Sequence, residues 1–491
     1  MEQTRLPRST PEKQGLSSWA ISHFLEELER ARVELHTFLL VRHGRVVAEG
    51  AWAPYSLEER RMLYSVSKSF TATAIGLAAA EGKLRLRDSV ASFFPDKLPA
   101  VPSPHLLAMK VKDLLTMSSG HSEDTTRWLY GREDGDWVKG FLHAPADYAP
   151  GTHFVYNNGA SYVLSALVTK VAGVSLLEYL LPRLFTPLGI TDPSWEANPE
   201  GISAGGWGLC LPVEDLAKFG LLYLQNGIWN GTSLLPPDWV AEASARQIAN
   251  GDDPRSDWNQ GYGYQFWRCR HGAYRASGAF GQICLILPEQ EAVLAVTGGT
   301  AQEKTILNAV WTHLLPALSS RPLPSDPEGQ VRLRERLMLL AHRPPDGSLR
   351  SPIASSLSEV LYQLDDNRLG IRTLVLHFDE EGRLLVDLEN QFGEHRLAFG
   401  MGEWACGTTE FLHGHSSPVC AAAAWREERT LELAIRFTET PFCETLVCRF
   451  APKEVSVTLS RNVGYHAKEE TFRGRKQETA GNAPPAGLPP L

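Results

Sequence analysis

The spacing of hydrophobic and polar positions changes along the chain. Between residues 16 and 318, apolar residues mostly recur at the helical spacing of about 3.6 residues. Ser17 or Ser18 can cap the first helical stretch, and Gly82, Gly120 and Gly173 are placed to end three others. The predicted helices cover residues 16–33, 66–81, 111–120, 161–173, 213–227 and 302–318.

Strand-like runs lie at both ends of this region. Residues 36–50 are typical of a hairpin that turns at His43–Gly44. Because hairpins join antiparallel neighbours, we expect strands from both ends to form one antiparallel sheet flanked by helices. The strands at the second end follow residue 259 and are predicted in GYGYQFWRC, AYRASGAFGQICLIL and EAVLAVTGG. Together these elements predict an α/β (α+β) domain over residues 1–320.

The rest of the chain has a different pattern. Proline clusters predict a linker region over residues 321–352. Apolar and polar residues then alternate, as in Leu374, Leu376 and Phe378, which predicts a small all-β domain over residues 353–465. The Pro- and Gly-rich end predicts a disordered tail over residues 466–491.

Composition and charge exclude several classes of protein. The 491 residues include 48 basic and 57 acidic ones, a net charge of −9, which argues against a nucleic-acid binder. The N-terminal stretch lacks the apolar core of a secretory signal, and no apolar run reaches the roughly 18 residues of a spanning helix. We therefore expect a cytoplasmic protein with neither nucleic-acid nor membrane partners. The oligomeric state stays open.

Cysteine and histidine usage predicts neither metal nor cofactor. The 7 cysteines are irregularly spaced and form no Cys-x-x-Cys, which favours reduced thiols over a disulfide framework or a zinc ribbon. His413 and His415 lie two apart but have no third ligand at a suitable spacing.

One short motif can support nucleophilic catalysis. Ser65-Val66-Ser67-Lys68 is the only Ser-x-x-Lys in the chain, and it lies where a predicted helix begins. Positions i and i+3 share a helix face, so the Ser65 hydroxyl and the Lys68 amine can meet. A serine needs an adjacent base, and lysine acts as one only where burial or neighbours lower its pKa. Taken alone, the motif is also compatible with a solvated helix face.

Two further motifs follow in order. Tyr156-Asn157-Asn158 precedes a predicted helix, and Ala276-Ser277-Gly278-Ala279 is expected to start a strand. Together with the stretches LYSVSKSF, DLLTMSSGH and GGWGLCLPVEDLAKFG, this order resembles the serine β-lactamase and penicillin-binding protein superfamily. The resemblance covers about residues 10–318 and is closest to the class C-like branch. That branch includes class C β-lactamases, D-amino-acid peptidases, β-lactamase-fold esterases and 6-aminohexanoate-dimer hydrolases.

The resemblance implies a role for each motif residue. Ser65 matches the acylated nucleophile, Lys68 its base partner and Tyr156 the tyrosine that exchanges protons with the nucleophile and the leaving group. Whether Lys68 or Tyr156 takes the first proton stays open. The backbone N–H groups of Ser65 and Ala279 match the oxyanion hole. The implied substrate-binding and orienting residues are Asn158, Ser277, Gly278 and Ala279.

This sequence departs from the family pattern at Ala276, where the family usually has Lys or His. A hydrogen bond to a charged group contributes roughly 1.5–3 kcal/mol of binding free energy. Without a cation at position 276, recognition of a β-lactam carboxylate should therefore be weaker. A nearby arginine could replace the cation. The candidates for that cation are Arg255, Arg268 and Arg275. Three other residues are candidates for the wall of the cleft, with a structural role as the alternative: His121, Trp207 and Gln282.

The sequence therefore predicts a serine hydrolase that acts on small esters or amides through an acyl-enzyme. One alternative is a weak or inactive binding or sensor protein on the same fold. Another is a true β-lactamase or D-amino-acid peptidase.

Overall fold

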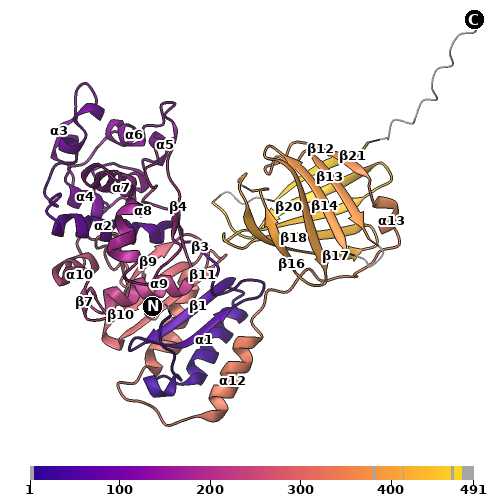
Figure 1. Ribbon diagram of the computed structural model, residues 1–491, viewed down its shortest axis with the longest axis horizontal. Helices are drawn as coiled ribbons and strands as arrows, with labels where there is room; N and C mark the ends of the chain where they lie inside the picture. Colours follow the sequence, from indigo (N-terminus) through magenta and orange to yellow (C-terminus); the bar gives the residue numbers. More distant parts are fainter. Residues whose placement is uncertain (1–4, 380–382, 413, 466–468, 478–491) are drawn as a thin grey trace, which may run out of the picture. The chain divides into compact units, whose positions relative to one another are not determined.

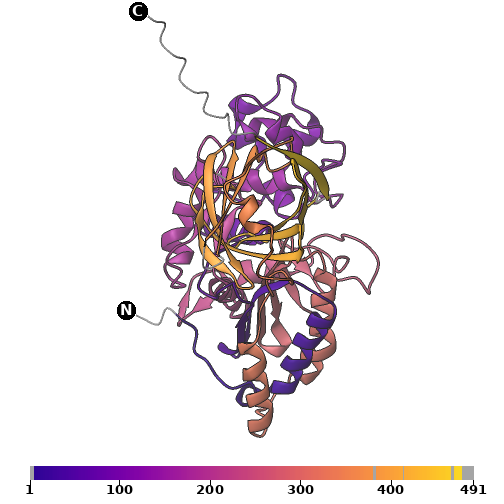
Figure 2. The same cartoon turned by 90° about the vertical axis from the view of Figure 1, so that its right-hand side faces the viewer.

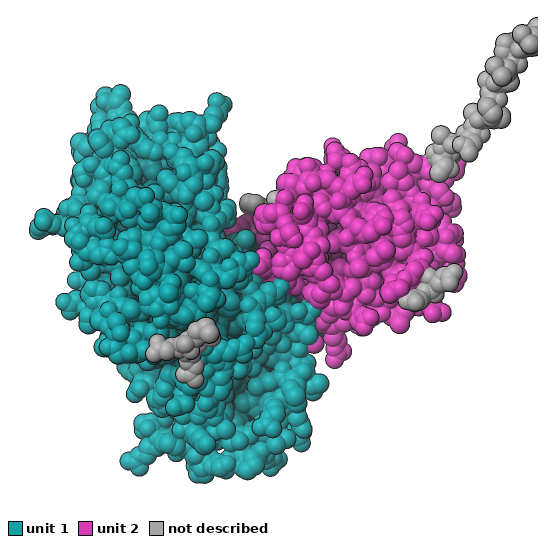
Figure 3. All heavy atoms as spheres, in the orientation of Figure 1, with its two compact units in different colours: residues 1–340 teal, residues 341–491 magenta. Residues whose placement is uncertain are grey.

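The structure is a computed structural model that describes residues 5–379, 383–412, 414–465 and 469–477. It divides into two compact units, Met1–Leu340 and Ala341–Leu491, coloured teal and magenta in Figure 3. The first unit contains every motif residue that the sequence singles out for catalysis.

A six-stranded antiparallel sheet forms the centre of the first unit. Its strand order is β2-β1-β11-β10-β9-β8, so the N-terminal hairpin pairs with strands from the end of the unit. This confirms the predicted sheet flanked by helices. The strands are β1 (Leu35–Arg42), β2 (Arg45–Ala51), β8 (Trp267–Arg268), β9 (Tyr274–Gly278), β10 (Gln282–Leu287) and β11 (Ala292–Gly298).

Helices cover both faces of this sheet, so alternate strand residues enter different cores. Leu294 and Val296 of β11 pack under the terminal helices, and Val293 and Ala295 pack under the central ones. The terminal helices lie together on one side of the sheet (Figures 1 and 2). They are α1 (Ser18–Arg30), which Ser17 caps, α11 (Glu303–Ala309), the π-helix η7 (Val310–Leu314) and α12 (Pro327–Met338).

The central part of the first unit is mostly helical. Its first helix, α2, is buried almost throughout, from Ser67 to Ala78. The helices here are α2 (Ser67–Ala80), α3 (Pro104–Ala108), α4 (Val111–Leu115), α5 (Thr126–Tyr130), α6 (Trp137–His143), α7 (Asn158–Ala172), α8 (Leu176–Leu180), α9 (Val213–Leu224) and α10 (Pro237–Ser244). The short strands are β3 (Arg61–Met62), β4 (Ser194–Trp195), β5 (Leu209–Leu211), β6 (Ile228–Trp229) and β7 (Thr232–Ser233).

The structure differs from the sequence prediction around the third motif. The run predicted as one strand, AYRASGAFGQICLIL, forms two, β9 and β10. Phe280 and Gly281 adopt left-handed φ values of 66° and 89°, which extended chain does not tolerate, so the chain turns there. Residues 276–278 therefore end β9 and Ala279 follows it, whereas the sequence predicts that residues 276–279 start a strand.

The segment predicted as a linker, residues 321–352, contains helix α12. Asp326 caps this helix and Pro327 occupies its first turn, so the proline cluster starts a helix here. Arg336 of α12 forms ion pairs with Glu26 and Glu29 of α1, and the two helices pack side by side (Figure 1). The first unit consequently extends to residue 340.

The second unit is an all-β domain. Its ten-stranded sheet closes into a barrel because β15 also pairs with β17, and alternate apolar side chains fill the interior. Strand β21 comes from the segment predicted as a disordered tail, and residues 478–491 lie outside the described ones. The elements are α13 (Ala354–Leu357), β12 (Leu361–Leu364), β13 (Thr373–Phe378), β14 (Leu384–Asn390), β15 (Gly393–Met401), β16 (Ala405–Thr409), β17 (Ser417–Glu427), β18 (Thr430–Phe437), β19 (Cys443–Phe450), β20 (Glu454–Arg461) and β21 (Glu470–Lys476).

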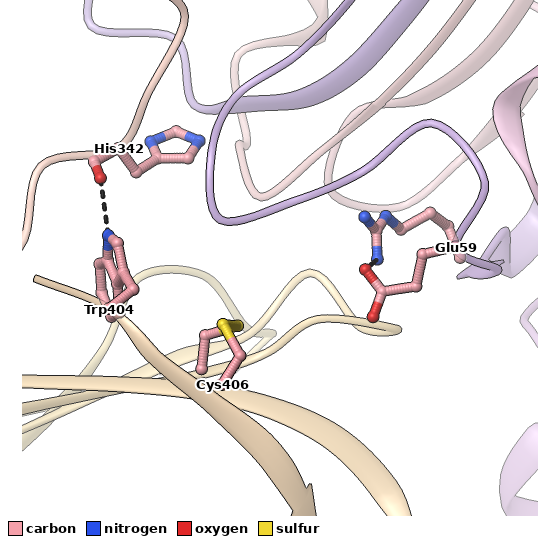
Figure 4. Close-up of a disulfide and its surroundings, with 6 residues drawn as sticks. Glu59, His342, Trp404 and Cys406 are labelled. Atoms are coloured by element: carbon pink, nitrogen blue, oxygen red, sulfur yellow. Dashed lines mark hydrogen bonds and ion pairs between the residues drawn. A yellow bond between two sulfur atoms is a disulfide. The ribbon is translucent and has the colours of Figure 1, made fainter. Parts of the chain in front are cut away.

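A disulfide joins Cys406 to Cys420, contrary to the expectation of reduced thiols. The two residues face each other across β16 and β17, a pairing that depends on strand register and that cysteine spacing does not reveal. Figure 4 shows this disulfide and Trp404, whose Nε1 donates a hydrogen bond to the carbonyl oxygen of His342 at 2.8 Å. Of the two histidines weighed as metal ligands, His413 lies outside the described residues.

Within the described residues, no single helix is both long enough and apolar enough to cross a membrane. One pair, Asn158–Ala172 and Leu176–Phe185, meets that test jointly but is bent by 69°.

Candidate active site

The turn before helix α2 presents Ser65. This residue lies in the 3-10 turn η2 (Tyr64–Val66), which runs directly into α2, and Tyr64 has a left-handed φ of 49°. Ser65 is half-buried, while Lys68 is only 1% exposed. The Nζ atom of Lys68 lies 3.0 Å from the Ser65 Oγ, so the structure brings the predicted pair into hydrogen-bond contact.

Lys68 has two further partners, and both are carbonyl oxygens. Its Nζ donates to Asn158 Oδ1 at 2.7 Å and to the Gly206 carbonyl at 2.6 Å. A neutral amine has two N–H groups and one lone pair. Because neither carbonyl can donate, the two N–H groups point at them and the lone pair is left for the Ser65 hydroxyl. In its neutral form, Lys68 is therefore oriented to accept the proton of Ser65.

Burial favours that neutral form. It lowers the pKa of Lys68 to about 7, and the charge of Asp124 opposes the shift. Asp124 also fixes the Asn158 amide, because its carboxylate accepts from Asn158 Nδ2 at 2.6 Å and therefore leaves Oδ1 facing Lys68. Sequence reasoning missed Asp124 and Gly206, since both reach Lys68 or its partner only through tertiary contacts.

The start of helix α7 positions the second motif. The side chain of Asn157 caps this helix by accepting from the N–H groups of Gly159 and Ala160, which places Tyr156 and Asn158 on either side of the cap. The Lys68 Nζ lies 4.9 Å from the centre of the Tyr156 ring. The ring of Trp267 stacks on that of Tyr156 with a centroid separation of 5.5 Å. Serine, lysine, tyrosine and asparagine thus converge on one site.

The third motif approaches the nucleophile through its backbone. A Cβ atom on Gly278 would lie 2.2 Å from the Leu63 carbonyl oxygen and 3.1 Å from the Ser65 nitrogen, so only glycine permits this approach. The buried Gln282 side chain holds the turn that follows, because its Nε2 donates to the carbonyls of Ala279, Phe280 and Gly298. Gln282 therefore supports the segment that carries the predicted oxyanion donor Ala279.

The side chain of Ser277 contacts an acidic residue that the sequence did not single out. Its Oγ lies 2.8 Å and 2.9 Å from the two carboxylate oxygens of Glu303, at the start of α11. Arg275 forms an ion pair with the same carboxylate at 2.7 Å and is fully buried. The other two arginines considered as substitute cations lie elsewhere. Arg255 pairs with Asp253, and Arg268 donates to the carbonyls of Ser244 and Gly272.

The remaining cleft candidates have structural contacts. His121 is buried, its ring is tilted against that of Phe141 with a centroid separation of 4.7 Å, and its Nδ1 is hydrogen-bonded to the Ser119 hydroxyl. Burial lowers its pKa to about 4, so it is neutral. Trp207 is half-buried beside Trp137, and its carbonyl accepts a hydrogen bond from Trp195.

A known protein family matches most of the first unit. The family model described as Beta-lactamase matches residues 25–308, more than half of the chain. A 6-aminohexanoate-dimer hydrolase of Paenarthrobacter ureafaciens is 25% identical over 312 residues, which cover 59% of this chain and 80% of that protein. A lovastatin esterase of Penicillium rubens is 27% identical over 170 residues, covering 30% of this chain and 42% of the esterase.

A solved structure shares the fold. The octameric penicillin-binding protein homologue from Pyrococcus abyssi superposes with a TM-score of 0.50 at 18% identity, covering 93% of this chain and 99% of that one.

Proposed function

This chain belongs to the beta-lactamase family of serine hydrolases, and we propose that it hydrolyses small esters or amides through an acyl-enzyme formed on Ser65. The observation that carries the proposal is the environment of Lys68. This amine lies 3.0 Å from the Ser65 Oγ, its other two partners are carbonyl oxygens, and its pKa is lowered to about 7. A lysine in that state is a base at neutral pH.

The proposed reaction begins with proton transfer from Ser65 to Lys68. The Oγ then bonds to the substrate carbonyl carbon, and the electron pair that moves to the carbonyl oxygen is stabilised by the N–H groups of Ser65 and Ala279. Collapse of this intermediate breaks the bond to the leaving group, which takes a proton through Tyr156. Water then attacks the ester on Ser65 and gives one proton to Lys68, which passes it to the departing Ser65 Oγ, so that the acid is released and the serine hydroxyl is restored.

We assign the first proton transfer to Lys68 because of its orientation as well as its pKa. The Asp124–Asn158 contact directs the Asn158 oxygen to Lys68, and this leaves the amine lone pair for Ser65. We assign the onward transfer of that proton to Tyr156, whose ring centre lies 4.9 Å from the Lys68 Nζ.

Esters are the preferred substrate class in this proposal. An alkoxide leaves without full protonation, whereas an amine does not, so esters react faster for the same acyl group. The similarity to a lovastatin esterase supports esters, and the similarity to a 6-aminohexanoate-dimer hydrolase supports amides.

Labelling with a fluorophosphonate probe tests the nucleophile directly. We expect one covalent adduct, mapped to Ser65 by peptide mass spectrometry, and loss of both the adduct and ester hydrolysis in Ser65→Ala. Ser92→Ala, a change at an exposed serine, is the matched control and should keep both. A folded wild-type protein that neither reacts with the probe nor hydrolyses p-nitrophenyl esters would instead be a binding protein on this fold.

A further inference from the structure

We propose that Glu303, acting through Ser277, makes this site discriminate against carboxylate-bearing substrates and favour a hydrogen-bond donor or a cation at the third motif. The inference rests on the proposed function, because it concerns which esters the Ser65 site accepts. In this scheme Glu303 is a positioning and specificity residue and does not touch the reacting atoms.

The hydroxyl hydrogen of Ser277 is already donated to Glu303. A serine hydroxyl has one hydrogen to donate, and an ionised carboxylate can only accept. Both oxygens of Glu303 lie within 2.9 Å of Ser277 Oγ, so this hydrogen points at Glu303. Ser277 can then offer other groups only its lone pairs, which accept from N–H or O–H and repel carboxylate oxygens.

The position of Ser277 brings this preference to the reaction centre. The next residue, Gly278, lies against the backbone of Ser65 at the end of β9. Ser277, which contacts Glu303, therefore lies one residue before the strand end that contacts the nucleophile.

The positive charge of Arg275 does not turn the Ser277 position into a binding site for carboxylates. Arg275 is fully buried, its Nη1 donates to the Asp257 carbonyl, and the ring of Trp258 covers its guanidinium at 4.4 Å. A further acidic group nearby, the Asp257 carboxylate, forms an ion pair with Arg270 at 2.8 Å. Arg275 thus holds Glu303 in place, while the carboxylate of Glu303 remains the charge that Ser277 contacts.

The test compares esters that differ by one charge. One pair, p-nitrophenyl hexanoate and mono-p-nitrophenyl adipate, changes the end of the acyl chain from methyl to carboxylate. A second pair, 4-nitrophenyl acetate and 3-carboxy-4-nitrophenyl acetate, places the carboxylate on the leaving group. For each pair, the measured quantity is the ratio of kcat/KM for the neutral ester to that for the anionic ester.

We expect both ratios to exceed 1 in the wild type after correction for intrinsic reactivity, and at least one to fall about fivefold or more in Glu303→Gln. Glu289→Gln removes the same charge from an exposed turn and should leave both ratios unchanged. A merely structural role of Glu303 would lower the rates of both esters together and leave the ratios intact. Unchanged ratios in a folded Glu303→Gln protein that still labels at Ser65 overturn the proposal.

A second variant covers the case in which Glu303→Gln does not fold because Arg275 has lost its partner. The double change Arg275→Met with Glu303→Gln removes both charges of the buried pair and avoids an uncompensated cation. The same fall in the ratio is expected, and an unchanged ratio again overturns the inference. If the wild type hydrolyses none of the four esters and does not label, the proposed function itself has failed.

Discussion

Two lysines are buried in the first unit, and their surroundings differ. Lys68 at the start of α2 contacts a hydroxyl and two carbonyl oxygens, and the Asp124 carboxylate hydrogen-bonds to its partner Asn158. Lys218 in α9 forms an ion pair with Asp215 at 2.7 Å and also donates to the Gly189 carbonyl. Burial alone therefore does not turn a lysine into a general base. A lysine becomes one where its partners are neutral acceptors and a lone pair is left over.

The largest expected effect is on the rate constant. Lys68→Met should lower kcat/KM for p-nitrophenyl butyrate by about 10³-fold or more, because the proton acceptor of Ser65 is removed. Steady-state kinetics measure this, with circular dichroism to confirm folding. Lys218→Met is the matched control, and an equal loss of rate in the two folded variants would contradict the comparison.

The next effect is on stability and concerns the other lysine. Lys218→Met leaves the Asp215 carboxylate buried without its cation, which should cost about 3–5 kcal/mol in the free energy of unfolding. Urea denaturation measures it. The double change Lys218→Met with Asp215→Leu should recover most of the loss. Equal stability of Lys218→Met and wild type would show that this pair contributes nothing to the fold.

A third prediction concerns a position that lacks a lysine altogether. With Ala276 in the third motif, kcat/KM for p-nitrophenyl acetate should exceed that for nitrocefin by about tenfold or more, or ~1.4 kcal/mol in transition-state free energy. A chromogenic assay of both substrates at one pH decides it. A tenfold preference for nitrocefin would mean that the site recognises a β-lactam carboxylate without that lysine.

The smallest effect is a shift in pH dependence. Lys68 acts as a base only when neutral, so kcat/KM should rise with pH and reach half its maximum near the Lys68 pKa of about 7. Asp124 raises that pKa, so Asp124→Asn should move the rise to lower pH. The pH profiles of both proteins, measured with a neutral ester, check the direction. A shift to higher pH, or a wild-type profile that is flat from pH 5 to 10, contradicts this role for Lys68.

Local patterns account for what the sequence predicts well. The Ser65–Lys68 spacing, the Ser17 cap of α1 and the apolar faces of the helices are all set within a few residues. Asp124, Gly206 and Glu303 have no such signature, because each reaches the site from a distant part of the chain. The linker predicted over residues 321–352 fails at Pro327 for a related reason, since a proline cluster is typical of either a linker or the first turn of a helix. The turn at Phe280–Gly281 also escaped prediction, because phenylalanine rarely adopts a left-handed conformation.

Strand β21 has a consequence for where the chain can be shortened. This strand lies between β20 and β12 in the sheet of the second unit, although its sequence, ETFRGRK, is mostly polar. Deleting everything after residue 465 would remove it and uncover the backbone N–H and C=O groups of both neighbours. Such open edges pair with other chains, so the trimmed protein should self-associate, whereas one that ends after Lys476 should not.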